Sequence, residues 1–312
     1  MTFSIVISTY NRLDLLKRAI ASALNQTVPC EVVVADDAST DGTEAYLHSL
    51  GDQVVYHRNG QNLNHAGTVN AGVAAASGDW VKLLDDDDYL APNCIEAMDQ
   101  AIACHPQAVI CSCQAAQVDI NGAELRRTAT PGPGVMFYIP QSAIHYGMLL
   151  DRVPFGTPVQ VAFHRQAFLK TGGWDTTMTT NYDDIDAWIR LAEHGDALFL
   201  NQCLAYRTVW PGGHEQKMSL QNRLALNITI KQRIHQRVGP TYQTQCPSMQ
   251  DLSDYLHLHW GLVALRQKQL GAALPMILPA VLNRAAWRLL YQARQLRSSP
   301  AAGELIPKQV IG

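Results

Sequence analysis

The chain has 312 residues, of which 47% are hydrophobic and 16% are charged, and its formal net charge is −3. This composition is that of a globular protein with enough apolar residues to bury a large core, and it excludes an intrinsically disordered chain. A net charge close to zero provides no overall basic field, so the sequence predicts no nucleic-acid partner.

The seven cysteines are an odd number and include no CxxC pair. Buried, reduced thiols are therefore favoured over a zinc site, for which the ligand spacing is missing. The N-terminus shows no basic segment ahead of a long apolar one, and no stretch reaches the ~18 apolar residues that span a bilayer. We expect a cytoplasmic protein. Peripheral contact with the inner face of the membrane is a further expectation.

Short apolar runs alternate with helical patterns in the first third of the chain. Strands are predicted over residues 3–8, 31–35, 54–57 and 79–84. Between the first two, Leu13, Leu16 and Ile20 recur at helical spacing, and a helix of small residues is predicted over 70–76. Strands that alternate with helices predict an α/β class with a Rossmann-like, mostly parallel central sheet flanked by helices.

Polar residues stand where three of these strands end. Ser8-Thr9-Tyr10 follows the first strand, Asp36-Asp37 follows the second, and the four aspartates from Asp85 to Asp88 follow the fourth. Parallel sheets of this kind bind ligands outside the carboxyl ends of their strands. We therefore expect the three clusters to meet at one edge of the sheet.

The run from Asp85 to Asp88 concentrates negative charge that repels unless water or a cation neutralises it. Mg²⁺-type cations are usually held by one or two carboxylates together with the phosphates of a substrate. The run thus predicts a metal–phosphate site. The alternative is a solvated acidic turn that only ends the strand.

From about residue 219 the sequence becomes helical and basic, without strand-like runs. We expect one domain over residues 1–218 and a helical C-terminal extension over 219–312. Within the extension, residues 272–294 mix apolar, basic and aromatic side chains. This mixture fits a helix at a membrane surface, but it favours a helix packed against the first domain.

Five segments in a fixed order carry a resemblance to a known family. They are residues 4–12, 33–43, 84–92, 172–175 and 181–191. In these segments the chain resembles the family 2 glycosyltransferases of the GT-A fold, over roughly residues 3–215. The resemblance implies transfer of a sugar from a nucleotide sugar with inversion at the anomeric carbon. The expected donor is a UDP-sugar. The implied acceptor is a hydroxyl of a glycan or of a lipid-linked saccharide.

The resemblance also implies residue roles on the side of the sugar donor. Asp37 would accept the ring N–H of uracil, with Ser8 and Tyr10 lining the base pocket. Capping of the helix near residue 40 is the alternative for Asp37. Asp85 would hold the donor ribose or a metal-bound water. Asp86 is expected among the donor-binding residues. The alternative is that Asp86 faces solvent and has no function.

Two further residues are implied as ligands of Mn²⁺ or Mg²⁺, the expected cofactor. Asp87 would coordinate the cation that bridges the diphosphate of the donor, where positive charge offsets the charge that develops on the leaving group. His214, in a glycine-rich loop, would complete the metal shell. His65 lies where relatives have a loop over the donor.

On the acceptor side, Asp184 would be the general base that deprotonates the attacking hydroxyl, with Asp183 beside it. An N-cap pair for the following helix is the alternative for both. Trp174, after two glycines, would stack on a sugar face, and a buried core position is its alternative.

Two other functions compete with glycosyl transfer. A nucleotidyltransferase shares an α/β sheet and an acidic metal site, but it normally has a glycine-rich phosphate loop after the first strand, where this chain has Thr9-Tyr10-Asn11-Arg12. The other is a catalytically inactive domain that binds glycan or serves as a scaffold.

Overall fold

The computed structural model describes residues 1–130, 132–153, 155–178, 182–210, 218–298 and 306–311. The chain divides into two compact units. The sheet unit comprises Met1–Gln141, Phe155–Gly212 and Lys308–Gly312, and the helical unit comprises Ser142–Pro154 and Gly213–Pro307. The chain crosses between them four times. The predicted division at residue 218 differs from this one, because residues 142–154 belong to the helical unit and 308–312 to the sheet unit.

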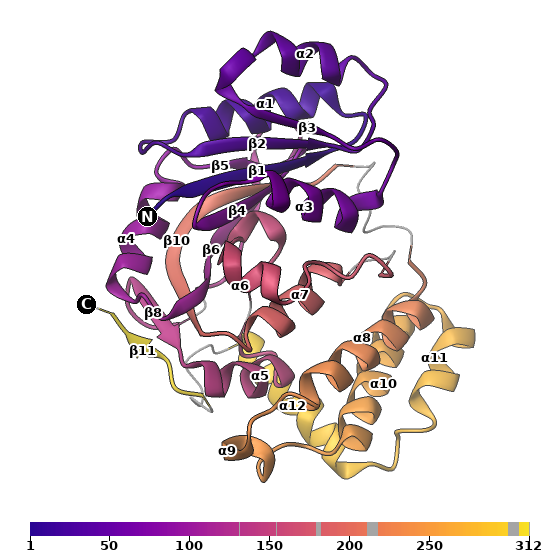
Figure 1. The fold of residues 1–312 in the computed structure, drawn as a ribbon. Coiled ribbons are helices and arrows are strands. Elements are labelled where there is room, and N and C mark those ends of the chain that lie inside the picture. Colours follow the sequence, from indigo (N-terminus) through magenta and orange to yellow (C-terminus); the bar gives the residue numbers. More distant parts are fainter. Residues whose placement is uncertain (131, 154, 179–181, 211–217, 299–305, 312) are drawn as a thin grey trace. The chain divides into compact units, whose positions relative to one another are not determined.

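The sheet unit is built on one mixed sheet, whose described strands run in the order β11-β8-β10-β6-β9-β4-β1-β2-β3 (Figure 1). Four parallel neighbours form one end: β4 Trp80–Asp85, β1 Phe3–Thr9, β2 Glu31–Asp36 and β3 Val55–Arg58. The expected α/β class with a mostly parallel central sheet is confirmed.

The remaining strands extend and brace this sheet. Strand β6 Ala108–Val118 is parallel to β10 Asp196–Thr208, and β9 Val161–His164 lies antiparallel between β6 and β4. The shorter strands pair antiparallel: β5 Tyr89–Leu90 with β10, β7 Glu124–Arg127 with β6, β8 Met136–Ile139 with β10, and β11 Gln309–Val310 with β8.

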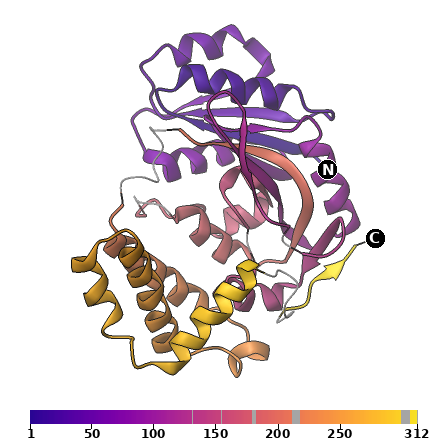
Figure 2. The same ribbon diagram turned by 180° about the vertical axis from the view of Figure 1, so that it is seen from behind.

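Helices cover both faces of the parallel strands. They are α1 Leu13–Leu24, α2 Thr43–Ser49, α3 Asn64–Ala75, α4 Cys94–Cys104, α6 Arg165–Lys170 and α7 Asp183–Leu191. Figures 1 and 2 show α1 and α2 on one side of β1 and β2, and α3 on the other. All of β1 is buried because alternate residues face opposite layers: Ile5 and Ile7 pack with α1 and α4, and Val6 lies against Gly72 of α3.

The seven cysteines are free, as expected. Cys94, Cys111 and Cys113 are buried, whereas Cys104 is exposed. The expectation of a buried thiol is therefore wrong for Cys104.

The helical unit contains most of α5 Gln141–Leu149, then α8 Leu220–His235, α9 Pro240–Gln243, α10 Met249–Arg266, α11 Leu270–Ile277 and α12 Arg284–Ser298. Its core includes Leu224, Leu258 and Leu290. The buried Lys231 of α8 donates to the carbonyl oxygens of Met148 (3.0 Å) and Leu149 (2.6 Å), and so fixes α5 to α8. Within the described part of the chain, no helix combines the length and the apolar character needed to cross a bilayer.

Candidate active site

The carboxyl ends of β1, β2 and β4 lie side by side. Ser8 is the register partner of Asp85 on one side and of Ala35 on the other, and Thr9 is the partner of Asp36. This register brings the three polar clusters to one edge of the sheet, as predicted from the order of strands and helices.

The four aspartates form a tight turn after β4. The amide N–H of Asp88 donates to the carbonyl oxygen of Asp85 (3.1 Å), and the buried carboxylate of Asp88 accepts from the amide of Thr208 in β10 (2.8 Å). Burial, and then the charges of Asp87 and Asp85, raise the pKa of Asp88 well above its usual range. Asp88 thus anchors the turn to the sheet.

Asp86 is buried and binds three residues at and just after the end of β1. Its carboxylate accepts from the Thr9 hydroxyl (2.9 Å), the Tyr10 amide (3.4 Å) and the Arg12 guanidinium (2.9 Å). Burial raises the pKa of Asp86 to about 6, against the opposing charge of Arg12. The alternative of a solvent-facing Asp86 is wrong, because the turn directs this side chain inward.

Asp87 is held by two side chains from other elements. Its Oδ2 accepts from the indole N–H of Trp210 (2.9 Å) and from Arg12 (3.4 Å), whose guanidinium also lies over the Trp210 ring at 5.5 Å. Arg18 donates to the backbone oxygen of Asp87 (2.6 Å). Burial and the neighbouring charge of Asp85 raise the pKa of Asp87. This carboxylate is therefore oriented but sits in an excess of negative charge.

His65, at the start of α3, joins the strand edge to α7. Its Nε2 lies 3.1 Å from Asp85 Oδ1, and its Nδ1 lies 3.7 Å from Asp183 Oδ2. Desolvation opposes the charged imidazolium, but hydrogen bonds to Asp183 and Asp85 outweigh it and hold the pKa of His65 well above its usual value. For Asp85, burial likewise opposes ionisation, and His65 and Arg12 outweigh it to lower its pKa. A protonated His65 thus bridges two carboxylates from distant parts of the sequence.

Asp184 follows Asp183 in the first turn of α7. The amide of Asp184 donates to Asp183 Oδ1 (3.1 Å), and Asp184 Oδ1 accepts from the amide of Ile185 (2.7 Å). Each carboxylate therefore also satisfies a free N–H of the helix start, and this structural role is compatible with a chemical one. Burial, and then the adjacent charge of Asp183, raise the pKa of Asp184 to about 7.

The loop before α7 is fixed by an ion pair within the helix. Arg190 donates to the carboxylate of the buried Asp186 (2.9 Å) and to the carbonyl oxygens of Thr171 (2.8 Å) and Gly173 (2.6 Å). A Cβ on Gly173, whose φ is +76°, would lie 2.5 Å from an oxygen of Asn70. The Gly172-Gly173 pair therefore permits both the left-handed backbone and the close approach to α3.

Trp174 is a buried side chain. It is 2% exposed, and its ring meets the edges of Trp188 (6.2 Å) and His65 (5.2 Å). Asn70 holds its backbone by accepting from the Trp174 amide (2.8 Å) and donating to its carbonyl (2.9 Å). A ring enclosed in this way offers no face for stacking on a sugar, so the core alternative is correct. Trp174 contributes by packing against His65.

Asp37 lies at the end of β2 and is buried. Its Oδ1 accepts from Asn59 (2.9 Å) and from the amide of Leu63 (2.7 Å), which ties β2 to the segment ahead of α3. It does not cap α2. Asp41 contacts that helix start instead, through the amide of Thr43 (3.2 Å). Near Asp37, Ser8 is mostly buried, whereas Tyr10 is 47% exposed.

A divalent cation fits the oxygen atoms of the turn. Among the residues that the structure describes, no three His, Cys, Asp or Glu side chains converge into a metal cage, and His214 lies outside these residues. A cage is not required for Mg²⁺-type ions, which one or two carboxylates hold together with substrate phosphates. Asp87 offers a hard carboxylate oxygen, and a cation there would offset the neighbouring charge of Asp85.

Three residues of this site have no role predicted from the sequence: Arg12, Arg18 and Trp210. Arg12 lies inside the first segment of the family resemblance, next to the predicted Tyr10, and this was the one available signal. Nothing in the sequence connects Arg18 or Trp210 to an acidic turn about 70 to 120 residues away.

Comparison with solved structures defines the class of fold. The structure of Staphylococcus aureus TarS 1-349 in complex with UDP-GlcNAc matches with a TM-score of 0.62 and 14% identity, over 100% of this chain and 99% of that one. The mannosyltransferase PcManGT from Pyrobaculum calidifontis, in complex with GDP-Man and Mn²⁺, matches with a TM-score of 0.57 and 19% identity, over 96% and 81%. The sheet unit therefore has the GT-A glycosyltransferase fold.

Sequence comparison narrows the class to a family. Residues 4–172 match the family described as Glycosyl transferase family 2, and the chain belongs to that family. This membership removes the nucleotidyltransferase alternative. A GalNAc(5)-diNAcBac-PP-undecaprenol beta-1,3-glucosyltransferase of Campylobacter jejuni is 37% identical over 103 residues, which are 31% of this chain and 33% of the relative. The chain spans between 27% and 44% of the length of the first three curated relatives.

Proposed function

We propose that the sheet unit transfers a sugar from a nucleotide sugar to an acceptor hydroxyl with inversion at the anomeric carbon. The contact of His65 with both Asp85 and Asp183 carries this proposal. It joins the strand edge, where sheets of this kind bind ligands, to the helix start that carries Asp184. The proposed donor-binding residues and the proposed base therefore lie together within the sheet unit.

Asp184 is the proposed general base. An ionised Asp184 accepts the proton of the acceptor hydroxyl while that oxygen forms a bond to the anomeric carbon. The bond from this carbon to the nucleoside diphosphate breaks on the opposite face, which inverts the configuration. A pKa of about 7, raised by burial and by Asp183, makes Asp184 a stronger base than an ordinary aspartate and leaves it partly ionised at neutral pH.

Asp37, Ser8 and Tyr10 are the proposed contacts to the nucleotide base. The exposed ring of Tyr10 is available for stacking, and the fixed carboxylate of Asp37 offers a hydrogen-bond acceptor. We place Asp85 at the donor ribose and Asp86 behind the base pocket, where it holds Thr9, Tyr10 and Arg12. The base is proposed to be uracil, as in the ligand of the TarS complex.

Mn²⁺ or Mg²⁺ is the proposed cofactor, with Asp87 as a ligand and His214 as a candidate second one. Such a cation would offset the negative charge on the leaving diphosphate. The proposal is supported by the excess of carboxylates around Asp87 and by the Mn²⁺ named in the PcManGT complex.

The proposed acceptor is a hydroxyl of a glycan or of a lipid-linked saccharide. The name of the Campylobacter relative, which describes a saccharide on undecaprenol diphosphate, supports this class. We further propose a cytoplasmic location with peripheral contact to the inner face of the membrane.

Replacement of Asp184 by Asn tests the base. Loss of a general base lowers kcat by about 10²- to 10⁴-fold, and the donor-induced rise in melting temperature should persist because Asp184 does not bind the nucleotide. Asp14→Asn, which removes an exposed carboxylate of α1, is the matched control. Near-normal transfer by Asp184→Asn would rule out the base assignment.

A thermal-shift screen of nucleotide sugars with and without Mn²⁺ tests the donor and the cation. UDP-sugars should raise the melting temperature, with a larger rise when Mn²⁺ is present, because a ligand that binds only the folded state stabilises it. A larger rise with GDP-sugars would contradict the choice of base. Equal shifts and equal transfer rates after chelation would contradict the metal role.

A further inference from the structure

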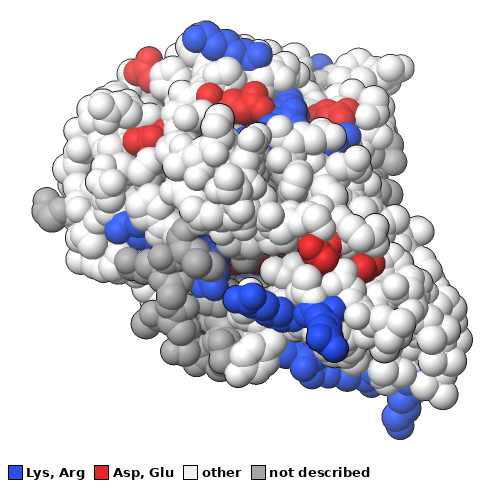
Figure 3. All heavy atoms as spheres, turned by 90° about the horizontal axis from the view of Figure 1, so that it is seen from below, with Lys and Arg blue, Asp and Glu red and all other residues white. Residues whose placement is uncertain are grey.

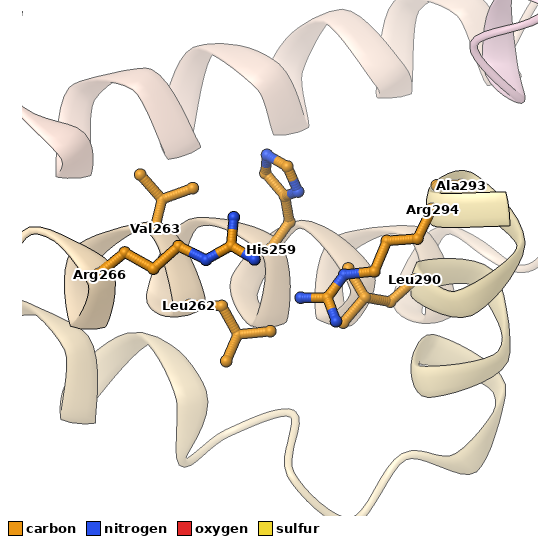
Figure 4. A pocket seen from close by; sticks show the side chains of 7 residues that line it. All are labelled: His259, Leu262, Val263, Arg266, Leu290, Ala293 and Arg294. Atoms are coloured by element: carbon orange, nitrogen blue, oxygen red, sulfur yellow. The ribbon is translucent and has the colours of Figure 1, made fainter. Parts of the chain in front are cut away.

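A cavity of about 250 Å³ lies between α10 and α12 of the helical unit. Its lining combines basic and apolar side chains, among them His259, Arg266, Arg294, Leu262, Val263 and Leu290. Figure 4 shows Arg266 and Arg294 extending toward each other from two different helices, across the cavity. The catalytic proposal above makes no use of this pocket.

The chain around the pocket is strongly cationic. Residues 255–303 contain no Asp or Glu, and they include Arg266, Lys268, Arg284, Arg288, Arg294 and Arg297. On the face shown in Figure 3, Lys and Arg side chains form a band in the lower half, and small groups of Asp and Glu side chains lie beside it. A cluster of one sign attracts ligands of the opposite sign, so the pocket is suited to an anion.

The two helices that carry the arginines are fixed together at their N-terminal ends. Asn283 donates to Asp251 (2.9 Å) and to Asp254 (2.8 Å) of α10, and it accepts from the amide of Ala285 at the start of α12 (2.9 Å). The acids of α10 are engaged there, ~18 Å along the helix from Arg266 at 1.5 Å per residue. Arg266 therefore lies far along α10 from these carboxylates, which join the two helices at their other ends.

The chemistry and the size of the pocket select the ligand. Two planar guanidinium groups from different helices match the oxygen atoms of a phosphate, which arginine binds with paired hydrogen bonds. A volume of about 250 Å³ accommodates a phosphate or diphosphate group and is below the ~300–1,000 Å³ of pockets for drug-sized ligands. The leucine and valine walls suit carbon atoms attached to that group.

Exposed apolar side chains continue from the pocket helices. On α12, Trp287 and Tyr291 precede the pocket arginine by two turns and one turn and are 40% and 62% exposed. Leu270 and Leu274 of α11 and Leu278, directly after its end, repeat every four residues and are all exposed. Apolar and aromatic residues beside arginines are typical of a surface that meets an amphiphile, whose chain lies on the apolar residues.

We infer that this pocket is a binding site for a phosphate monoester or diphosphate group, held between Arg266 and Arg294. The recognised chemistry is the terminal phosphate. Its source is a lipid headgroup or a soluble phosphate, and the two sources give different results in the experiment below.

The test measures binding of the full chain to two kinds of vesicle and to inorganic pyrophosphate. One vesicle contains phosphatidic acid, a phosphate monoester, and the other contains phosphatidylglycerol, a diester, so a preference for the first isolates monoester recognition from general attraction to anionic lipid. The variant Arg266→Gln/Arg294→Gln removes the pocket cations. Arg284→Gln/Arg288→Gln removes the same charge from exposed positions of α12 outside the pocket, as the matched control.

We expect the wild type to prefer phosphatidic acid by about tenfold, which corresponds to ~1.4 kcal/mol. The pocket variant should lose this preference, and the control should keep it while binding both vesicles more weakly. Arg266→Lys, which keeps the charge but not the planar donor pair, should show an intermediate preference. Circular dichroism melting checks that each variant is folded.

The outcomes separate the two sources. A preference lost only in the pocket variant indicates a lipid headgroup. Pyrophosphate binding that is lost only in the pocket variant, without any vesicle preference, indicates a soluble phosphate. Absence of both in the wild type, or equal losses in the pocket variant and the control, would overturn the inference.

Discussion

At the scale of single residues, the site depends on His65. Its imidazole contacts Asp85 at the strand edge and Asp183 at the start of α7, and Trp174 packs against its ring. The charge of His65 is also what keeps the pKa of Asp85 low despite burial. In the proposed mechanism His65 is a positioning residue, because it contacts both the proposed donor side and the proposed acceptor side.

Replacement of His65 by Ala should lower kcat/KM by about 10- to 100-fold, since hydrogen bonds to charged groups contribute ~1.5–3 kcal/mol. His65→Gln, which can still donate to Asp85, should recover part of this loss. Steady-state kinetics with varied donor concentration measure both variants. Equal activity of His65→Ala and the wild type would show that the bridge has no functional role.

The raised pKa of Asp184 predicts the pH dependence of the reaction. Because the base acts in its ionised form, kcat/KM should fall as the pH drops through about 7. Asp183→Asn removes a like charge, lowers the pKa of Asp184 and should shift this acidic limb to lower pH. Burial, which is the larger cause of the raised pKa of Asp184, remains in this variant. The acidic limb should therefore still lie at a higher pH than the pKa of an ordinary aspartate would give. A limb that does not move in Asp183→Asn would contradict the assignment.

At the scale of elements, α3 positions His65 because it packs tightly on the sheet. A Cβ on Gly72 would lie 2.6 Å from Val6 and 3.0 Å from Ala35, so the glycine sets the distance between α3 and strands β1 and β2. The same helix contacts the loop before α7 through Asn70. The position of α3 therefore determines whether the His65 imidazole reaches both of its partners, Asp85 and Asp183.

Gly72→Ala should destabilise the protein by about 1–3 kcal/mol, because overpacking shifts α3 from the sheet. Gly271→Ala is the matched control, since nothing lies within 4 Å of a Cβ at this exposed position in α11. There the substitution should stabilise by up to about 1 kcal/mol through helix propensity. Thermal melting by circular dichroism distinguishes the two signs, and a stabilised Gly72→Ala would refute the close packing.

The same elements show what a sequence can predict. The four parallel strands lie within one residue of their predicted bounds, and for β1, β2 and β4 the reason is a largely apolar run that polar residues end abruptly. Helix α3 starts at Asn64, whereas the pattern predicts a helix only from residue 70, since Asn64 and Gly67 have low helix propensity and tertiary packing overrides it. The contact of His65 with Asp183 joins residues 118 positions apart, and no local pattern encodes it.

At the scale of the whole molecule, the two units are interleaved along the chain. Residues 142–154 belong to the helical unit although they lie within the sequence of the sheet unit, and β11 returns to pair with β8. Every residue of α5 from Ala143 to Leu149 is buried, and Lys231 of α8 binds its last carbonyl oxygens. The domain boundary predicted at residue 218 would separate these partners.

A fragment of residues 1–218 should therefore be insoluble or markedly less stable than the full chain. It would expose the apolar residues of α5 and leave β8 without the strand β11. Soluble yield and size-exclusion chromatography, with the full chain as control, measure this. A monomeric fragment that melts like the full chain would show that the units are independent.

The network around Asp86 has a consequence for engineering the choice of nucleotide. One buried carboxylate holds Thr9, Tyr10 and Arg12, and Arg12 in turn holds Asp87. The segment proposed to contact the base and the turn proposed to contact the diphosphate are therefore coupled through Asp86 and Arg12. Chimeras that import residues 8–12 from a relative of different donor preference need the matching acidic turn from the same relative, because a foreign segment would leave Asp86 buried without its cation.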